Sequence, residues 1–186
     1  MVLNVLFSKE WHHAESAEEC SRLVSEVMEN LEFEDSSSKW VAPGEDAWFC
    51  FSDRRFESVT VQNSPDTYLR VAVNRSTGYG ALMWFATDRR PGRSEIFDYT
   101  WLSDNPEPPN FDPRVVADPG HPLFHHPRST LPLDRVRLVL EEFCRAGSGE
   151  RPKCIQWVQG ELNGQRLGEE PVVDFVDTSD LTDPWA

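Results

Sequence analysis

Five short segments rich in β-branched and aromatic residues follow one another in the middle of the chain, and they constrain its fold more than any other feature. They are "AWFCFS", "SVTVQ", "TYLRVAVN", "GALMWFA" and "EIFDYTWL", all within residues 47–102. Segments of this kind predict β-strands. The stretch "AVNRSTGYGAL" places a glycine-containing turn between two of them, which predicts a β-hairpin.

Two segments with helical spacing flank this region. The first, "SAEECSRLVSEVMENLE", begins with a capping box formed by Ser16 and Glu19. The second begins after Pro132 and ends near Gly147. Further strands are predicted at residues 2–7 and in "CIQWVQG", and the Asn-Gly pair in "LNGQRL" predicts another hairpin. The order strand, helix, strands, helix, strands predicts the α+β class, with a mostly antiparallel sheet packed by two helices.

Length and charge restrict both the domain count and the partners. The 186 residues fit one domain, and no repeat or hinge-like composition divides them, so residues 1–186 are expected to form a single domain. Acidic residues outnumber basic ones by 32 to 18, and the net charge is −14. A surface this acidic repels nucleic acid and anionic membranes and attracts basic proteins, although it also suits solubility alone. The sequence leaves open whether the acidic tail 168–186 is ordered.

Nothing in the sequence predicts secretion or membrane insertion. The stretch "MVLNVLFSKE" lacks the basic region and the long apolar run of a signal peptide, and no run approaches the length of a membrane span. The four cysteines show no C-x-x-C pair and no zinc-like spacing, and each lies among apolar neighbours. We therefore expect a soluble, reduced, cytoplasmic protein, a monomer or weak oligomer when free, with no metal or other cofactor.

A proline-rich segment, residues 103–131, is expected to be a long irregular loop, and loops of this length are often functional. Its stretch "HPLFHHP" holds three of the five histidines. The spacing of His121 and His125 would align both on one face of a helix, as many zinc sites require, but the flanking prolines disfavour a helix. A small metal-dependent hydrolase that uses His121, His125 and His126 is the alternative function.

Several apolar side chains could serve either the core or a protein interface. Phe97, Tyr99 and Trp101 alternate onto one face of their predicted strand, which is typical of a core, and Trp101 leads directly into the loop. Within the loop, Phe111, Leu123 and Phe124 could fold back over the core or anchor a partner, because a stiff backbone loses little entropy on binding. A homo-oligomeric scaffold could use the same surface.

No constellation of residues predicts catalysis. The sequence has neither a G-x-S-x-G elbow nor a glycine-rich phosphate loop, and its carboxylates cluster on a helix face and in the tail. We expect no enzymatic activity and assign no catalytic residue.

A group of segments in the second half of the chain resembles a known family. The segments are "YLRVAVNRSTGYGALMWF", "FDPRVVADPG", "FHHPRSTLP", "VRLVLEEFCRAGSGERPKCIQW" and "LNGQRL". They are similar to the family listed first among the immunity-protein families of bacterial polymorphic toxin systems, over residues 66–167. The most particular motifs are "PRSTLP" at residues 127–132 and "ERP" at residues 150–152.

The resemblance implies an α+β protein without catalytic activity that binds a toxin encoded beside it. Toxins that neighbour this family often belong to the nucleic-acid deaminase superfamily, so the expected partner is a basic, nucleic-acid-targeting deaminase whose substrate site is blocked. The sequence leaves open whether the motif residues contact the toxin or stabilise the fold. The residues expected to contact it come from the loop and the matched motifs: Trp101, Asp104, Phe111, Phe124, His125, His126, Arg128, Glu150 and Arg151.

Overall fold

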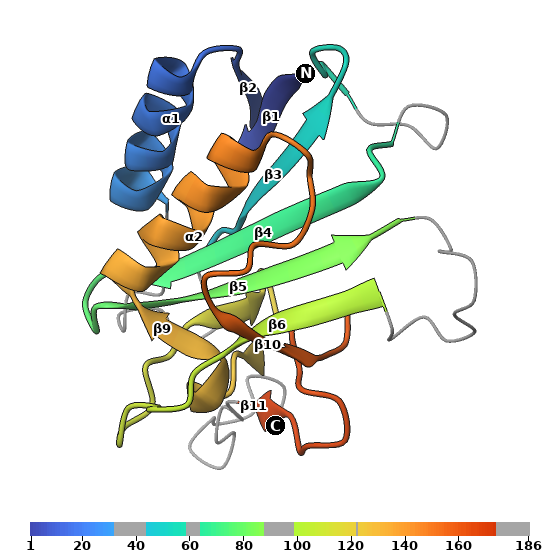
Figure 1. Cartoon of the computed structure of the whole chain (residues 1–186). Helices are drawn as coiled ribbons and strands as arrows, with labels where there is room; N and C mark the ends of the chain where they lie inside the picture. Colours follow the sequence, from blue (N-terminus) through green and yellow to red (C-terminus); the bar gives the residue numbers. More distant parts are fainter. Residues whose placement is uncertain (32–43, 59–63, 88–98, 122, 174–186) are drawn as a thin grey trace, which may run out of the picture.

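The computed structural model describes residues 1–31, 44–58, 64–87, 99–121 and 123–173, which form a large sheet, a small sheet and two helices (Figure 1). The helices are α1 (Ala17–Asn30) and α2 (Leu133–Ala146), and a short 3-10 helix spans Pro127–Ser129. The strands are β1 (Val2–Phe7), β2 (Glu10–Ala14), β3 (Ala47–Ser52), β4 (Thr67–Asn74), β5 (Tyr79–Ala86), β6 (Thr100–Asp104), β7 (Val116–Asp118), β8 (Leu123–Phe124), β9 (Thr130–Pro132), β10 (Gln156–Gln159) and β11 (Val172–Val173).

Within the described residues, the large sheet has eight strands in the order β10-β6-β5-β4-β3-β1-β2, and β9 pairs with β5 beyond the end of β6. The small sheet has the order β11-β8-β7. Every pairing in both sheets is antiparallel. The predicted α+β class, with a mostly antiparallel sheet and two helices, is confirmed.

Both helices pack on one face of the large sheet (Figure 1). The capping box predicted for α1 is present, because the hydroxyl of Ser16 accepts from the N–H of Glu19 and the Glu19 carboxylate accepts from the N–H of Ser16. α2 ends at Ala146, and the C-cap residue Gly147 has a φ of 62° that permits the turn that follows. The core between helices and sheet includes Leu23, Val27, Leu69, Leu82, Val136, Leu140 and Phe143.

The predicted hairpin between β4 and β5 is confirmed, since the two strands pair in continuous register from Thr67–Ala86 to Asn74–Tyr79. The expected strand at 58–62 falls largely outside the described residues, as does Phe97. Of the aromatic stripe that includes Phe97, Tyr99 is buried, and Trp101 is half-buried and packs on the core beneath the helices.

The segment 103–131 contains regular secondary structure, so the prediction of a long irregular loop is wrong. It contains β7, β8, the 3-10 helix and the start of β9. Side chains of the β4–β5 hairpin hold it, because Asn74 and Thr77 donate to the carbonyls of Arg114 and Pro113. Strands of two or three residues carry too little sequence pattern to be identified, and they depend on such tertiary hydrogen bonds. β2 likewise has no counterpart among the predicted elements.

Of the acidic tail, residues 168–173 are described and include β11, whereas residues 174–186 lie outside the described part of the chain. No helix among the described residues is long and apolar enough to cross a membrane.

Candidate functional site

Beyond the end of β10 the chain folds back in a short hairpin, residues 159–167. Gly160 pairs with Arg166 in an antiparallel bridge, and the N–H of Leu167 donates to the carbonyl of Gln159 over 3.2 Å. The hairpin predicted from "LNGQRL" is therefore confirmed. We call this element the 159–167 hairpin.

The motifs "LNGQRL" and "FHHPRSTLP", far apart in the sequence, pack against each other. Gly164 lies in the hairpin turn with a φ of 81°. A Cβ there would lie 2.8 Å from Cβ of Ala117 and 2.9 Å from Cε1 of His125, so only glycine fits. The side-chain amide of Gln165 donates to the carbonyl of Phe124 over 3.1 Å. Residues of both motifs thus form one packed unit.

Arg166, at 4% exposure, is a charged side chain buried at the centre of this unit. Its Nη1 donates to Oδ1 of Asp104 over 2.9 Å and to Oγ of Ser129 over 3.1 Å, and its Nε donates to Oε1 of Glu169 over 2.9 Å. Arg128 approaches the same Glu169 oxygen from outside, at 3.5 Å. We call these five residues the Arg166 cluster. Because a buried guanidinium requires paired acceptors, the cluster ties the end of β6, the 3-10 helix and the 159–167 hairpin together.

The "ERP" motif contributes a second arginine that supports the sheet. The guanidinium carbon of Arg151 lies 3.9 Å from the ring centroid of Trp101, and 5.9 Å and 6.0 Å from those of Trp84 and Trp157. A guanidinium within about 6 Å of an indole face is attracted to it electrostatically. Arg151 therefore fastens the connection between α2 and β10 onto three neighbouring strands, while Glu150 is exposed.

The three histidines of "HPLFHHP" have three different environments. His121 is exposed. His125 is 4% exposed, and burial, assisted by the charge of Arg70, lowers its pKa from 6.5 to about 3, so the ring is neutral. Nδ1 of His126 accepts from the N–H of Arg128 over 3.1 Å and caps the 3-10 helix.

These environments do not fit a metal-dependent hydrolase. Among the described residues, no group of three or more His, Cys, Asp or Glu side chains is arranged to hold a metal ion. His121, His125 and His126 therefore form no ligand set, and the alternative function lacks its site.

Two of the residues expected to contact a partner are buried. Phe124 is 2% exposed and His125 is almost as deeply buried, so neither side chain is available to a partner in this conformation. The physical reason is that Phe124 and His125 lie beneath the 159–167 hairpin, against Gln165 and Gly164. Phe111 is 47% exposed and packs edge-on against Tyr79, at the start of β5. Leu123 is half-buried.

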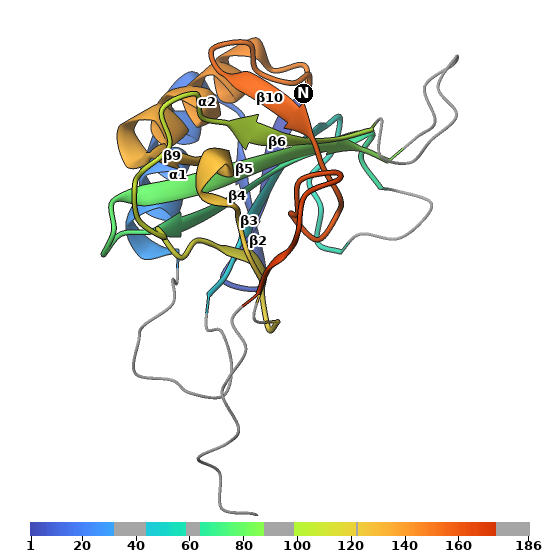
Figure 2. The same cartoon turned by 90° about the horizontal axis from the view of Figure 1, so that it is seen from below.

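β10 forms one margin of the large sheet, beyond β6 (Figures 1 and 2). The N–H of Gly160 donates to the carbonyl of Thr100, so the backbone groups of Gly160 face β6. In an antiparallel pair, the backbone groups of successive residues alternately face the neighbouring strand and point away from it. The backbone of Gln156 and Val158 therefore faces β6, whereas the N–H and C=O of Trp157 face outward. The described residues contain no strand on that outer side.

Exposed apolar side chains and several carboxylates follow β10 in the chain. Leu167 lies beside Gln159 at this margin, whereas the carbonyl of Leu162 accepts from Nη1 of Arg70 on β4 over 3.0 Å. Leu162 and Leu167 of the 159–167 hairpin are 52% and 40% exposed. Glu161, Glu169 and Glu170 lie in and directly after the hairpin. We call β10 together with these five residues the β10 edge surface. It was not among the predicted contacts, although two leucines in the polar stretch "ELNGQRLGEE" are a signal that could have indicated it.

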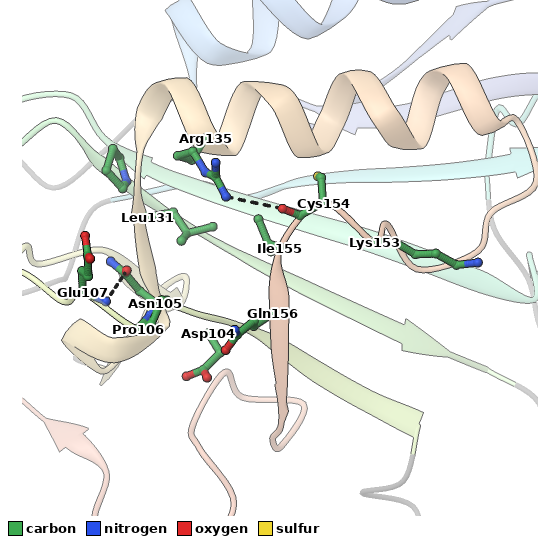
Figure 3. A pocket seen from close by; sticks show the side chains of 11 residues that line it. Asp104, Asn105, Pro106, Glu107, Leu131, Arg135, Lys153, Cys154, Ile155 and Gln156 are labelled. Carbon is green, nitrogen blue, oxygen red and sulfur yellow. Dashed lines mark hydrogen bonds between the residues drawn. The ribbon is translucent and has the colours of Figure 1, made fainter.

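A groove of about 610 Å³ opens at the start of β10, between this strand, β9 and the first turn of α2 (Figure 3). Arg135 of α2 donates to the carbonyl of Cys154 across its wall. Burial and the neighbouring Glu142 carboxylate raise the pKa of the Cys154 thiol to about 11, so this cysteine stays protonated. The thiol of Cys154 is therefore not an activated nucleophile.

Comparison with known proteins gives one match. A family model described as "Immunity protein Imm1" matches residues 9–159, which is most of the chain. The matched range begins just before β2 and ends at the last residue of β10, so it includes both helices and the large sheet except β1. No curated protein and no solved structure matches the chain significantly.

Proposed function

The chain belongs to the Imm1 immunity protein family, and from this premise we propose that it binds and inhibits a basic toxin that acts on nucleic acids, in particular a deaminase. Family membership supports a toxin immunity function and implies a cognate toxin as the partner. The match over residues 9–159 is the observation that carries the proposal. The deaminase assignment rests on the toxins that often neighbour this family, and the way the toxin is blocked rests on the charge of the chain.

The net charge of −14 favours a basic partner. A toxin that acts on DNA or RNA needs a positively charged groove for the phosphate backbone. An acidic protein can occupy such a groove, and complementary charge raises the association rate by steering the encounter. Exclusion of the single strand or of the flipped base from the deaminase pocket is sufficient to stop the reaction.

In this proposal the protein acts by steric and electrostatic obstruction, without catalysis of its own. It acts in the cytoplasm of the cell that makes the toxin, since the toxin's nucleic-acid substrates are there. Arg166, which is buried and ion-paired, and Arg151, which is half-buried against tryptophan rings, then stabilise the shape of the binding surface.

The test uses the toxin domain encoded next to this chain's gene. Cells that express the toxin domain alone should stop growing, and co-expression of this protein should restore growth. The purified proteins should form a complex, and deamination of a single-stranded oligonucleotide by the toxin domain should fall as this protein is added in equimolar amount. Absence of both binding and protection would contradict the proposed function, whereas protection from a toxin with another activity would remove only the deaminase assignment.

A further inference from the structure

We propose that the toxin docks on the β10 edge surface, where an extended segment of the toxin pairs with β10 as an additional strand. This inference rests on the proposed function and specifies where and how the partner binds. The segment carries basic side chains at the end that lies beside the 159–167 hairpin.

The backbone of β10 supplies the first part of the site. The N–H and C=O of Trp157 point away from β6, and no strand of the described chain lies beside them. An open sheet edge of this kind is a template for a further strand, and main-chain hydrogen bonds then provide affinity that depends little on the sequence of the incoming segment. The outward groups of Trp157 are therefore the centre of the proposed pairing.

Side chains of the segment that follows the strand supply specificity. Leu162 and Leu167 expose about half of their surface at the 159–167 hairpin, which is unusual for large apolar side chains in so polar a stretch. Glu161 directly precedes Leu162 in the chain, and Glu169 and Glu170 follow Leu167. Glu170 is exposed, whereas Glu169 is ion-paired with Arg166 and Arg128. Apolar contacts together with charged side chains are typical of protein interfaces, and unpaired carboxylates favour basic residues on the partner.

The surface is held rigid before any partner arrives. Arg166 fixes the hairpin to β6 and the 3-10 helix through Asp104 and Ser129, and Arg151 fixes Trp157 from the helix side of the sheet. A binding surface that is already ordered loses less conformational entropy on association. Asp104 and Arg151, which the sequence predicts as contacts, thus act by positioning this edge.

The charge of the chain favours a toxin, and not a second copy of the chain, as the partner that binds the β10 edge surface. Two copies joined edge to edge would bring two chains of net charge −14 together. Like charges across an interface oppose association, whereas a basic toxin segment complements the charge of the chain. The margin at β2, on the far side of the sheet, has no comparable pair of exposed leucines among the described residues.

Amide hydrogen exchange of the intact protein, followed by NMR with and without the neighbouring toxin domain, tests the pairing. The amide of Trp157 should exchange rapidly in the free protein and at least tenfold more slowly in the complex. The amides of Gln156 and Val158, already bonded to β6, serve as internal controls and should change little. A complex in which the Trp157 amide stays unprotected would overturn this inference and leave the proposed function intact; absence of any complex would instead contradict the proposed function.

Charge reversal provides the second test. The double variant Glu161→Lys/Glu170→Lys should weaken toxin binding at least tenfold. The matched control, Glu26→Lys/Glu29→Lys on the exposed face of α1, changes the net charge equally and should alter binding less than twofold. Equal losses in both variants would show that only the overall charge matters and would reject the β10 edge surface. Dimerisation of the free protein that disappears in the first variant would assign the edge to a second copy, which also overturns the inference.

Discussion

Arg166 and Asp104, 62 residues apart in the sequence, form a hydrogen-bonded ion pair of 2.9 Å in which the guanidinium is almost completely buried. The pair joins the end of β6 to the 159–167 hairpin. Two motifs that resemble an immunity family, "PRSTLP" and "LNGQRL", meet there through Ser129 and Arg166. Ser129 and Arg166 therefore stabilise the fold, and the surface that they support is available to a partner.

Removal of the buried guanidinium should destabilise the protein strongly. Arg166→Met leaves the carboxylates of Asp104 and Glu169 without their cation, and the expected loss in the free energy of unfolding is about 3 kcal/mol. Arg128→Met removes an exposed contact to the same Glu169 and should cost less than about 1 kcal/mol. Urea unfolding followed by tryptophan fluorescence measures both. Equal effects of the two substitutions would contradict the central role of Arg166.

Two glycines with similar positive φ angles allow the cost of backbone strain to be measured separately from the cost of a steric clash. Gly164 has a φ of 81° and Gly168 a φ of 77°, but only at Gly164 would a Cβ meet neighbouring atoms within 3 Å. Gly168→Ala should cost about 1–2 kcal/mol from the left-handed backbone alone. Gly164→Ala should cost a further amount of about 1–3 kcal/mol because the hairpin must move away from His125. Thermal unfolding of both variants provides the comparison, and similar melting temperatures would refute the tight contact.

The arginine above the tryptophans should contribute to stability through its ring contacts. Arg151→Ala is expected to lower the free energy of unfolding by about 2 kcal/mol, and Arg151→Lys by less, because lysine keeps the charge but loses the planar stacking. The neighbouring Glu150 is exposed, so Glu150→Ala should stay within about 0.5 kcal/mol of the parent. Chemical denaturation measures these differences. A loss at Glu150 as large as that at Arg151 would contradict this assignment.

The buried histidine predicts how stability depends on pH. The pKa of His125 is depressed to about 3 in the folded protein from an ordinary value of 6.5. The unfolded state therefore binds more protons between these values, and stability is fully present above pH 6.5 and falls as the pH decreases through this window. Between pH 7.5 and pH 5 the expected loss from this group is about 2 kcal/mol.

Urea unfolding at these two pH values tests the effect of His125. His125→Leu should show a smaller difference between the two pH values, even if it is less stable overall. The control His121→Leu, at an exposed position, should retain the pH dependence of the parent. An unchanged difference in His125→Leu would show that another group is responsible.

Salt should slow the association with the toxin. Because the proposed encounter is steered by opposite charges, an increase from about 0.05 M to 0.5 M salt should lower the association rate constant at least tenfold while the dissociation rate constant changes less. Stopped-flow fluorescence with the neighbouring toxin domain separates the two constants. An association rate that does not depend on salt would reject the electrostatic part of the mechanism.

The sequence by itself determined the local elements and the class of the fold. The capping box at Ser16, the turn between β4 and β5 and the helix that ends near Gly147 each depend on neighbouring residues, and each is present as predicted. Such elements follow from hydrogen bonds and periodicities within a few residues of the chain. The acidic composition likewise supports the proposal of a basic partner without reference to a structure.

Only the tertiary structure decided which side chains are available to a partner. Phe124 and His125 have the same residue types whether they lie on a surface or beneath a hairpin, and they are buried because Gly164, about 40 residues later, packs on the ring of His125. The outward groups of Trp157 depend on β10 lying at the margin of the sheet, which is set by its pairing with β6. Burial and strand order arise from contacts between distant residues, and neither is encoded in a local pattern.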